Sequence, residues 1–410
     1  MHVLFVGTRA PLTPERRGAI EKLTFDLAST LVAEGHDATV LTVGESGRRY
    51  TAEGVQLVEI TEPITRPPSH VTPVVEFGRK ARRVADRIHR ENPVDVVHAV
   101  YYPNLLGFRP PGDAPLVVAE HNAHPWRKEH RFIEELTITH RLRWEADTYI
   151  RLAEAHAAFF SAERVLSVSD AHGEWIDRAI PEARSKRETM YNFVDTDVYR
   201  PDAASERGID FPDGKTVLYA GRKVPHKGLH RAVSAISKME TDTTLVILGP
   251  LGSGFSDVDS LDGVNPDDLE PYLGSVIKNA QNSGVTDQIS FPGYVADADL
   301  PAYYAAADVT TFPSVLESFG MVPVESMACG TPVVAHDVPP IDETVLDGET
   351  GLLTNEVSAS ALAAALDRLL TDDSLRSQFA EQGRNRAVEQ FDIETAVQEH
   401  IRLYERVRSE

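Results

Sequence analysis

The sequence predicts an α/β protein with two Rossmann-like, doubly wound parallel-sheet domains that face a cleft. Three observations support this fold class. Short apolar runs alternate with helical patterns, the alternation restarts near residue 200, and 410 residues suffice for two or three ordinary domains. The apolar runs are compact, as expected for strands that are buried on both faces of a parallel sheet.

The first half begins with an expected strand at residues 2–6. A helix with apolar residues at i, i+3, i+7 and i+11 follows from Ile20 and ends at Gly35, a good C-terminal glycine. The other expected elements of this half are strands at 38–43, 94–99, 116–119 and 164–168, and a helix within 126–160.

The second half repeats the alternation. Its expected strands are 216–220, 244–248, 289–291, 309–312 and 332–335; its expected helices are 229–239, 300–307 and 323–328; and 257–268 reads as an acidic surface loop. We therefore expect a first domain of residues 1–195 and a second of residues 196–392. Ligands of such sheets bind beyond the carboxyl ends of the strands, so the cleft between the two domains is the expected site.

Charge separates the two halves. The chain has 41 basic and 63 acidic residues, a formal net charge of -22, which argues against nucleic acid as a partner. Residues 1–200 carry 26 basic and 29 acidic side chains, whereas residues 201–410 carry 15 and 34. Only nine basic residues are lysine. This composition favours a halophile-like protein from a salt-rich cytoplasm over an ordinary acidic bacterial one with a high-GC codon bias, and full activity at low salt would remove that interpretation.

The sequence shows no membrane span and no export signal. No apolar run reaches the roughly 20 residues that a span needs, and residues 1–6 lack the pattern of a signal peptide. The single cysteine, Cys329, cannot form an internal disulfide, and no Cys/His spacing indicates structural zinc. We expect a cytoplasmic protein.

The segment Glu317-Ser-Phe-Gly-Met-Val-Pro-Val-Glu325 follows the strand at 309–312. Pro323 is tolerated only in a first turn, so a helix is expected to begin near Gly320. Its free N–H groups suit a phosphate, while a carboxylate on either side suits hydroxyls. A ligand with hydroxyls at both ends and phosphates between them is a nucleotide sugar. The spacing alone does not exclude two surface glutamates.

A cationic turn follows the strand at 216–220. Gly221-Arg222-Lys223 and then Lys227-Gly228 precede the next helix, and cations beside a helix N-terminus call for an anion. The alternative is a solvated turn. No GxxxxGK[ST] motif is present, and Gly7 does not begin GxGxxG, so phosphate binding of the NTPase or dinucleotide kind is unsupported.

Together these motifs closely resemble retaining GT-B glycosyltransferases of the group 1, or GT4, family. The resemblance covers most of residues 215–391. It is carried by the two segments above and by Met327-Ala-Cys-Gly-Thr-Pro-Val-Val334 and Asp347-Gly-Glu-Thr-Gly-Leu-Leu353, and more weakly by Val168-Ser-Asp-Ala171 and Asn192–Pro201. It implies donor binding mainly by the second domain, and a last helix within 393–410 that crosses back to the first.

The resemblance also implies roles for individual residues. Arg222 and Lys227 would bind the donor diphosphate, and Glu325 the ribose. Glu317, with the amides of the segment from Ser318 through Phe319 and Gly320 to Met321, would contact the transferred sugar. His121 would lie near that sugar, with His124 and His130 as rivals, and Gly18 would let the backbone approach the phosphates. We expect Cys329 to contribute to packing and not to chemistry.

Three departures from the family pattern stand out. Gly18-Ala19 replaces a glycine pair, Asn192-Phe193 replaces Asn-Gly, and the turn Gly249–Gly254 is longer than usual. The first departure affects how closely the backbone approaches the phosphates, and the second affects a backbone contact of the missing glycine. The third affects recognition of the base or sugar.

The resemblance implies transfer of a hexose from a UDP- or GDP-sugar to a sugar or lipid-linked acceptor, in glycolipid, glycan or polysaccharide assembly. The expected mechanism is front-face attack with retention, in which the departing phosphate accepts the proton of the acceptor, without a metal or other cofactor. A GT-B nucleotide-sugar epimerase and a non-catalytic nucleotide-sugar-binding protein remain alternatives. Donor base, donor sugar, acceptor and oligomeric state stay open.

A basic helical stretch lies at residues 79–90. Its cations are Arg79, Lys80, Arg82, Arg83, Arg87 and Arg90. It suits a peripheral contact with an anionic membrane, at about 1 kcal/mol per charge, and would place the protein at the inner face of the membrane. The Debye length at 1 M salt is only about 3 Å, so a salt-rich cytoplasm would largely remove this attraction, and a solvated helix is the alternative.

Overall fold

The computed structural model describes residues 1–8, 18–44, 47–61, 71–100, 105–122, 138–209, 211, 214–251, 261 and 264–410. Of residues 71–74 and 138–148 it describes the backbone. His124, His130, the start of the helix expected within 126–160, residues 252–254, and residues 257–260, 262 and 263 of the expected loop lie outside these ranges. The chain divides into two compact units, Met1–Asn192 with Ile393–Glu410, and Phe193–Asp392.

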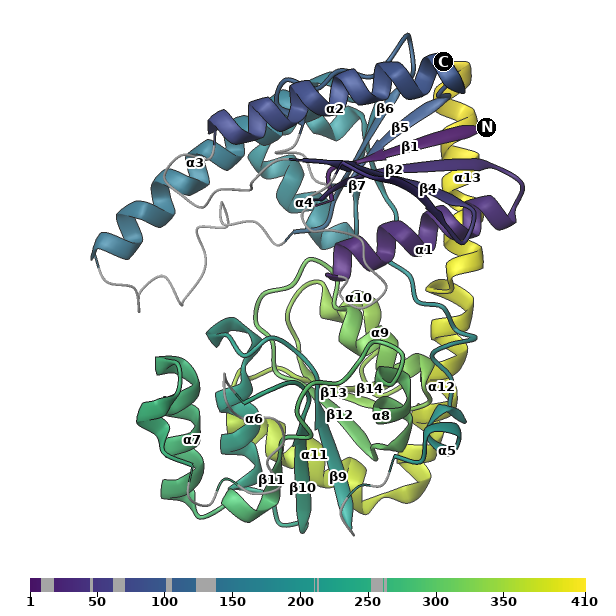
Figure 1. Ribbon diagram of the computed structural model, residues 1–410. Helices are drawn as coiled ribbons and strands as arrows, with labels where there is room; N and C mark the ends of the chain where they lie inside the picture. Colours follow the sequence, from purple (N-terminus) through teal and green to yellow (C-terminus); the bar gives the residue numbers. More distant parts are fainter. Residues whose placement is uncertain are drawn as a thin grey trace. The chain divides into compact units, whose positions relative to one another are not determined.

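The first unit contains an eight-stranded sheet in the order β3-β4-β2-β1-β5-β6-β7-β8 (Figure 1). The strands are β1 (His2–Val6), β2 (Asp37–Val43), β3 (Arg49–Ala52), β4 (Val55–Ile60), β5 (Val96–Ala99), β6 (Leu116–Glu120), β7 (Arg164–Ser167) and β8 (Arg187–Thr189). The helices are α1 (Ala19–Ala33), α2 (Val71–Glu91), α3 (Ile138–Ser161), α4 (Asp170–Ala179) and α13 (Ile393–Ser409). The strands predicted in this half are confirmed to within two residues.

One edge of this sheet differs from the all-parallel prediction. Strand β3 pairs with β4 in the antiparallel sense, and Glu53 and Gly54 between them have φ values of 50° and 80°. Two central residues with positive φ form the two-residue turn whose twist suits a hairpin. The alternation of β strands and helices did not reveal this hairpin, because its first strand is half-exposed and lacks an apolar run.

The first residues of the final helix, α13, lie beside the second unit in sequence, yet α13 belongs to the first unit. It packs against α1, and the Tyr404 hydroxyl lies 2.5 Å from His98 Nδ1 of β5 (Figure 1). His400 also stacks on His98. The last helix, expected within residues 393–410, is confirmed as Ile393–Ser409.

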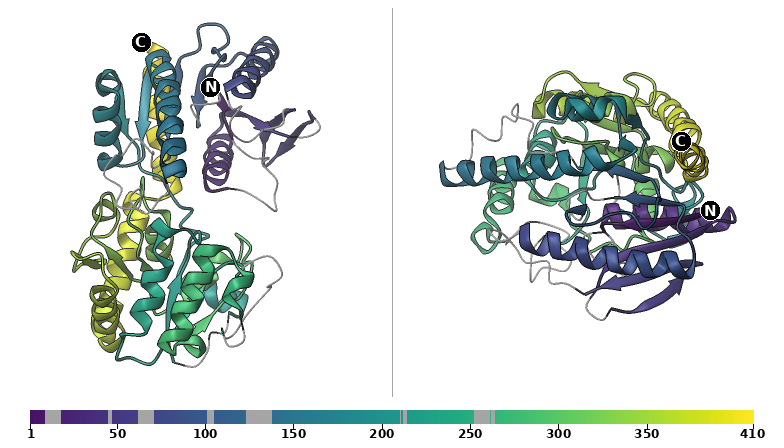
Figure 2. Two further views of the ribbon diagram at one scale, coloured as in Figure 1. Left: turned by 90° about the vertical axis from the view of Figure 1, so that its left-hand side faces the viewer. Right: turned by 90° about the horizontal axis from the view of Figure 1, so that it is seen from above.

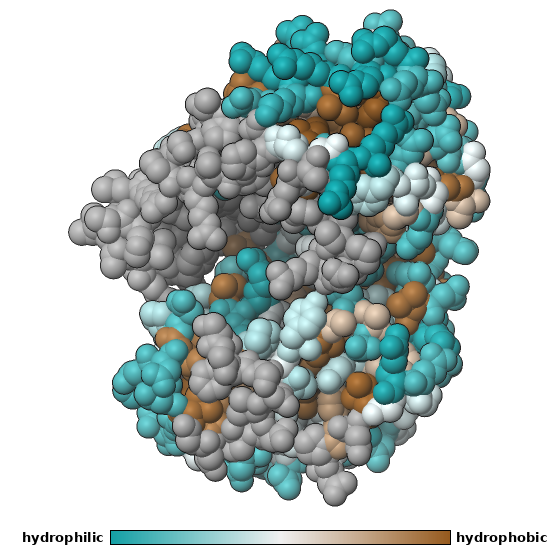
Figure 3. All heavy atoms as spheres, viewed as in Figure 1, coloured by the Kyte–Doolittle hydropathy of each residue, from teal (hydrophilic) through white to brown (hydrophobic). Residues whose placement is uncertain are grey.

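Helix α2 carries the basic stretch, as predicted. The side chains of Arg79, Arg82, Arg83, Arg87 and Arg90 are exposed, while Phe77, Ala81, Ala85 and Ile88 are buried on the opposite face. Hydrophilic side chains cover α2 in the view of Figure 3. Within the described ranges, no helix is both long and apolar enough to cross a membrane.

The second unit contains a six-stranded sheet, with parallel neighbours throughout, in the order β11-β10-β9-β12-β13-β14. The strands are β9 (Lys215–Tyr219), β10 (Thr243–Ile247), β11 (Ile289–Ser290), β12 (Val309–Phe312), β13 (Val333–His336) and β14 (Gly351–Thr354). The five strands predicted here are confirmed, and β14 is additional. The order reverses between β9 and β12, which is where ligands of doubly wound sheets bind.

Helices cover both faces of this sheet, as the side view of Figure 2 shows. They are α5 (Ala203–Arg207), α6 (Leu229–Ile236), α7 (Pro271–Ser283), α8 (Leu300–Ala306), α9 (Met321–Ala328), α10 (Ile341–Thr344), α11 (Ala359–Thr371) and α12 (Asp373–Gln390). The core between the sheet and α6, α7 and α11 includes the fully buried Leu229, Ile277 and Leu366. It fixes β9 and α6, whose connection carries the cationic turn.

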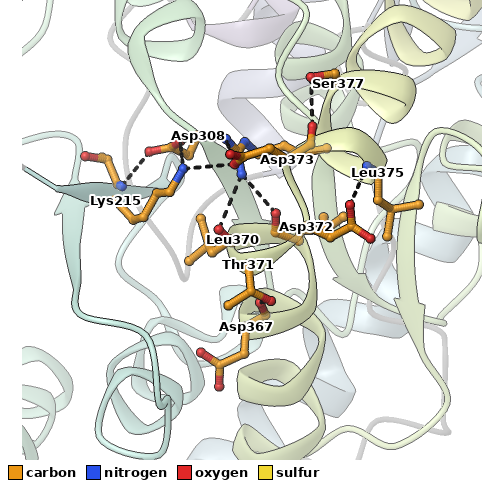
Figure 4. Close-up of polar contacts among 12 residues, drawn as sticks. Lys215, Asp308, Asp367, Leu370, Thr371, Asp372, Asp373, Leu375 and Ser377 are labelled. Atoms are coloured by element: carbon orange, nitrogen blue, oxygen red, sulfur yellow. Dashed lines mark hydrogen bonds and ion pairs between the residues drawn. The ribbon is translucent and has the colours of Figure 1, made fainter.

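An ion-pair network joins the amino ends of β9 and β12 to α12 (Figure 4). Lys215 Nζ lies 3.3 Å from both Asp308 and Asp373, and Arg376 lies 2.6 Å from Asp373. Arg376 also donates to the carbonyl oxygens of Leu369 and Leu370 at the end of α11. The network lies at the opposite end of the strands from their carboxyl ends, so it stabilises the unit without approaching the site.

We expect Arg376→Ala to lower the free energy of unfolding by about 1–2 kcal/mol, because two buried helix carbonyls lose a charged donor. Denaturant unfolding measures this loss. Ligand affinity should stay within about twofold of the wild type, since the network is remote from the carboxyl ends of the strands. A variant of unchanged stability would contradict the structural role.

Candidate functional site

The turn after β9 is held at both ends by one buried tyrosine. The Tyr219 hydroxyl lies 3.3 Å from the carbonyl oxygens of Arg222 and of Lys227, to which it donates. Burial raises the pKa of Tyr219, so the hydroxyl keeps its proton at neutral pH. The Arg222 side chain is exposed, and its guanidinium makes no ion pair or hydrogen bond with the residues that the structure describes. It is available to an anion from solution.

Lys227 and Glu317, which are far apart in sequence, form an ion pair. Lys227 Nζ lies 2.5 Å from Glu317 Oε1, and the two side chains are 19% and 10% exposed. Their backbones are also joined, because the His226 carbonyl accepts from Val315 N at 2.9 Å and from Ser314 Oγ at 3.2 Å. The fold thus brings a lysine, which can bind phosphate, next to a glutamate, which can accept hydrogen bonds from hydroxyls.

Gly228, the residue between Lys227 and α6, has no room for a side chain. Its φ is +77°, in the left-handed region, and a Cβ there would lie 2.1 Å from the carbonyl oxygen of Pro313. Only glycine allows this close approach of two backbones without strain. The approach keeps the cationic turn against the loop that carries Glu317.

Gly228→Ala is expected to lower stability by about 1–3 kcal/mol, from positive φ and from the backbone clash. The clash also separates Lys227 from Glu317, so nucleotide affinity should fall in the same variant. The matched control is Gly284→Ala, because Gly284 also has positive φ (+69°) but has open space around it. Gly284→Ala should lose stability but keep its nucleotide affinity. Equal nucleotide affinity in the two variants would contradict the role of the close approach at Gly228.

Helix α9 begins where the sequence predicted. Gly320 is its N-cap with φ +101°, and a Cβ there would lie 2.7 Å from Ile341 Cδ1. Phe319 is buried and packs edge-to-face on Phe391 at 5.6 Å, so Phe319 can offer a ligand only its backbone. The first N–H groups of a helix lack intrahelical partners, which leaves the segment from Ser318 to Met321 suited to an anion.

Glu325 lies on α9 and is oriented by a residue that the sequence analysis missed. The hydroxyl of Tyr304, on α8, donates to Glu325 Oε2 at 2.8 Å. Burial and the neighbouring Glu325 carboxylate raise the pKa of Tyr304 well above its ordinary value, so Tyr304 remains a donor. No sequence signal distinguishes Tyr304 from a core tyrosine, since its ring packs beside Tyr199 like one.

The Lys223 side chain contacts the backbone that follows β10. Its Nζ donates to the carbonyl oxygen of Leu248, at the end of β10, at 2.8 Å and lies 5.9 Å from the centre of the Phe291 ring. Gly249 has φ +91°, and a Cβ there would lie 2.9 Å from this Nζ. Burial lowers the pKa of Lys223 to about 8. The sequence pattern groups Lys223 with Arg222, but the Lys223 side chain donates a hydrogen bond to the backbone at the end of the neighbouring strand, β10.

The lowered pKa of Lys223 predicts a pH dependence of stability. Between about pH 8 and 10.5 the unfolded chain binds this proton and the folded chain releases it, so stability should rise with pH across that window. Below pH 8 the cost of burying the charge is fully present. Denaturant unfolding at pH 7.5 and at pH 9.5 should show that the free energy of unfolding of the wild type rises with pH relative to that of Lys223→Met. The same change in both proteins would contradict the lowered pKa of Lys223.

His121 and Gly18 belong to the first unit. His121 follows β6, and its Nδ1 lies 3.1 Å from Asn192 Oδ1; burial lowers its pKa, so the ring is neutral at pH 7. Gly18 is the N-cap of α1 with an ordinary φ of −69°, and a Cβ there would lie 2.3 Å from the Glu21 carboxylate. The predicted contact of Gly18 with phosphate stays a prediction.

In the second unit, Arg222, Lys227, Glu317, the start of α9 and Glu325 all follow strands β9 and β12, at the switch point of the sheet. The arrangement offers cations and amides to an anion, and carboxylates to hydroxyls. Over the described ranges, no three His, Cys, Asp or Glu side chains form a group that could hold a metal ion.

Fold and site together define a class of protein. The chain matches the family model "Glycosyltransferase Family 4" over residues 20–198 and the model "Glycosyl transferases group 1" over residues 204–386. The two matches follow one another and account for most of the chain. The chain belongs to the group 1, or GT4, family of glycosyltransferases.

Individual relatives point to the same family. D-inositol 3-phosphate glycosyltransferase of Frankia alni is 33% identical over 242 residues, 56% of this chain and 55% of that protein. Alpha-D-kanosaminyltransferase of Streptomyces kanamyceticus is 26% identical over 320 residues, 75% of this chain and 74% of that protein. The chain spans about half the length of the inositol phosphate relatives that it matches.

Solved structures share the fold. Sucrose-phosphate synthase from Thermosynechococcus elongatus has a TM-score of 0.77 at 22% identity, covering 100% of this chain and 99% of that chain. Anabaena HepE, solved in complex with UDP and glucose, has a TM-score of 0.66 at 20% identity, covering 98% of both chains. These likenesses confirm the predicted fold class, two parallel-sheet α/β domains of the GT-B type.

Proposed function

We propose that the protein transfers a hexose from a UDP- or GDP-sugar to a hydroxyl of an acceptor, with retention of anomeric configuration. The observation that carries this proposal is the contact of Lys227 with Glu317 beside the start of α9. A cation for phosphate and a carboxylate for hydroxyls are adjacent there, as a glycosyl phosphate requires.

Each residue has a distinct proposed role. Arg222 and Lys227 bind the diphosphate, assisted by the N–H groups of the segment from Ser318 to Met321. Glu325, oriented by Tyr304, accepts hydrogen bonds from the ribose hydroxyls. Glu317 binds hydroxyls of the transferred sugar once the diphosphate draws Lys227 toward itself, and His121 contacts another hydroxyl of that sugar.

The proposed chemistry needs no protein nucleophile. The acceptor oxygen attacks the anomeric carbon on the face from which the diphosphate departs, and the bond from that carbon to the phosphate oxygen breaks. The departing phosphate takes the acceptor proton. Arg222, Lys227 and the amides of α9 stabilise the charge that develops on the phosphate, so we propose metal-independent transfer, which activity in excess chelator tests.

The acceptor is proposed from the relatives. Several relatives are named D-inositol 3-phosphate glycosyltransferase, so D-inositol 3-phosphate is a candidate acceptor besides a sugar or a lipid-linked acceptor. The exposed cations of α2 support a peripheral contact with anionic lipid at the cytoplasmic face of a membrane. Flotation with anionic vesicles, with and without charge reversal of residues 79–90, tests that contact at low and at high salt.

A panel of UDP- and GDP-sugars in a thermal-shift assay tests the proposed donor. A donor at 100 times its Kd should raise Tm by about 5–10 °C. Product analysis with the donor found in this way then separates the alternatives: sugar appears on the acceptor for a transferase, an isomeric donor appears for an epimerase, and neither appears for a binding protein. No shift with any nucleotide sugar would overturn the proposal.

A further inference from the structure

Helix α12 holds both ends of α9, the helix whose start is proposed to bind the diphosphate. At the carboxyl end of α9, Arg384 Nη1 donates to the carbonyl oxygen of Ala328 at 2.7 Å. At its amino end, the ring of Phe391, the C-cap residue of α12, packs edge-to-face on Phe319 with 5.6 Å between the ring centres. The contacts run in opposite order along the two helices, so α12 lies antiparallel to α9. All these residues belong to the second unit.

Phe391 is itself held by its backbone and by its ring. Its side chain is buried, and its carbonyl oxygen accepts a hydrogen bond from Val194 N at 2.8 Å. The guanidinium carbon of Arg386 lies over the ring, 5.4 Å from its centre, which is a cation–π contact. Arg386 is anchored in turn, because its Nε donates to the carbonyl oxygen of Thr344 at 3.0 Å and its Nη2 to that of Glu343 at 2.7 Å. These contacts fix the orientation in which the Phe391 ring meets Phe319.

The backbone that follows Phe319 is confined from a second side. Gly320 is buried, and a Cβ added to it would lie 2.7 Å from Cδ1 of Ile341, on α10. The peptide unit is planar, so the positions of Phe319 and Gly320 together set the direction of the Gly320 N–H group. A hydrogen bond weakens steeply when this direction is wrong, so an anion at the start of α9 depends on the placement of Phe319.

We propose that Phe391 is a positioning residue for the diphosphate: its ring holds Phe319 in place, and thereby keeps the N–H groups of Gly320 and Met321 aimed at a phosphate. Because Phe391 is buried, it acts through Phe319 and not by touching the ligand. The effect on ligand binding rests on the proposed function, which places the diphosphate at the start of α9. The restraint on Gly320 rests on the side-chain contacts alone.

The restraint on Gly320 is measured without any ligand. In the full-length protein labelled with 15N-glycine, NMR relaxation gives the order parameter of the Gly320 amide, whose signal is identified by its loss in Gly320→Ala. We expect a value of about 0.85 in the wild type and one that falls toward about 0.6 in Phe391→Leu. The matched control is Phe379→Leu, because Phe379 is also fully buried on α12 but belongs to the core against the sheet. An unchanged Gly320 order parameter in Phe391→Leu would overturn the proposal.

Ligand affinities test the positioning role. Calorimetry with UDP and GDP, and with uridine and guanosine, separates the contribution of the diphosphate from that of the nucleoside. Phe391→Leu should bind the nucleoside diphosphate about tenfold more weakly, the effect of roughly one misdirected charge-assisted hydrogen bond, and keep its affinity for the nucleoside within about twofold. Phe379→Leu should lose stability and keep both affinities. An equal loss for nucleoside and nucleoside diphosphate, or the same loss in both variants, would show a general loosening and contradict the proposal.

A milder variant keeps the test open if Phe391→Leu does not fold. Arg386→Met leaves the Phe391 ring in place but removes the cation above it, so it should weaken binding of the nucleoside diphosphate by about threefold and lower the Gly320 order parameter less. No change in either quantity would contradict the proposal. Unchanged nucleotide affinity in Lys227→Ala would instead refute the proposed function, and with it the effect of Phe391 on ligand binding, while the relaxation data still decide whether Phe391 restrains Gly320.

Discussion

Replacing Lys227 by alanine is expected to lower kcat/KM by about 10²–10³-fold, or roughly 2–4 kcal/mol of transition-state stabilisation. The ammonium group is proposed to neutralise charge on the departing diphosphate. Its removal also leaves the Glu317 carboxylate, 10% exposed and 2.5 Å away in the wild type, without its cation. That carboxylate would then repel the phosphate, which adds to the loss.

Steady-state kinetics with the donor identified by thermal shift measures the effect of Lys227→Ala. The matched control is Lys215→Ala, because Lys215 also pairs with carboxylates but lies at the amino end of β9. It should lose stability and keep kcat/KM within about threefold of the wild type. A loss of less than threefold in Lys227→Ala would contradict the assignment of Lys227.

Arg222→Ala is expected to lower kcat/KM by a similar 10²–10³-fold, at about unchanged stability. The two cations differ in what they touch: the Arg222 guanidinium is exposed and has no ion pair within the part of the chain that the structure describes, so folding loses nothing when it is removed. Arg222→Ala should therefore lower kcat/KM with the diphosphate donor and leave the free energy of unfolding of the ligand-free protein unchanged.

Unfolding curves and steady-state kinetics, measured on the same preparation, give the free energy of unfolding and the kcat/KM of Arg222→Ala separately. Arg376→Ala is the converse control, since it should lose stability and keep activity. Arg222→Lys retains the charge but not the planar pair of donors, and should recover only part of the rate. Activity of Arg222→Ala within threefold of the wild type would show that Arg222 does not bind the diphosphate.

Much of the fold could be predicted from the sequence, because buried parallel strands are compact apolar runs that alternate with helices. Strands such as Val309–Phe312 and the start of α9 after Gly320 appear where expected. The hairpin of β3 and β4 was missed, since its half-exposed first strand has no such run. Short strand β14 follows a loop rather than a helical pattern and was missed as well.

The site was predictable in its residue types but not in its contacts. Sequence patterns selected Lys227 and Glu317 separately, for phosphate and for sugar; that they pair with each other depends on the backbone approach at Gly228, which no local pattern shows. The turn of Lys223 toward β10 and the bond from Tyr304 to Glu325 are likewise long-range contacts. Long-range contacts decide these roles.

A crystal structure with a bound nucleoside diphosphate sugar tests the central claim most directly. We predict Arg222 and Lys227 within hydrogen-bonding distance of the diphosphate, Lys227 drawn away from Glu317, and Glu325 on the ribose hydroxyls. A donor bound elsewhere, or one whose diphosphate leaves the contact between Lys227 and Glu317 intact, would contradict the account.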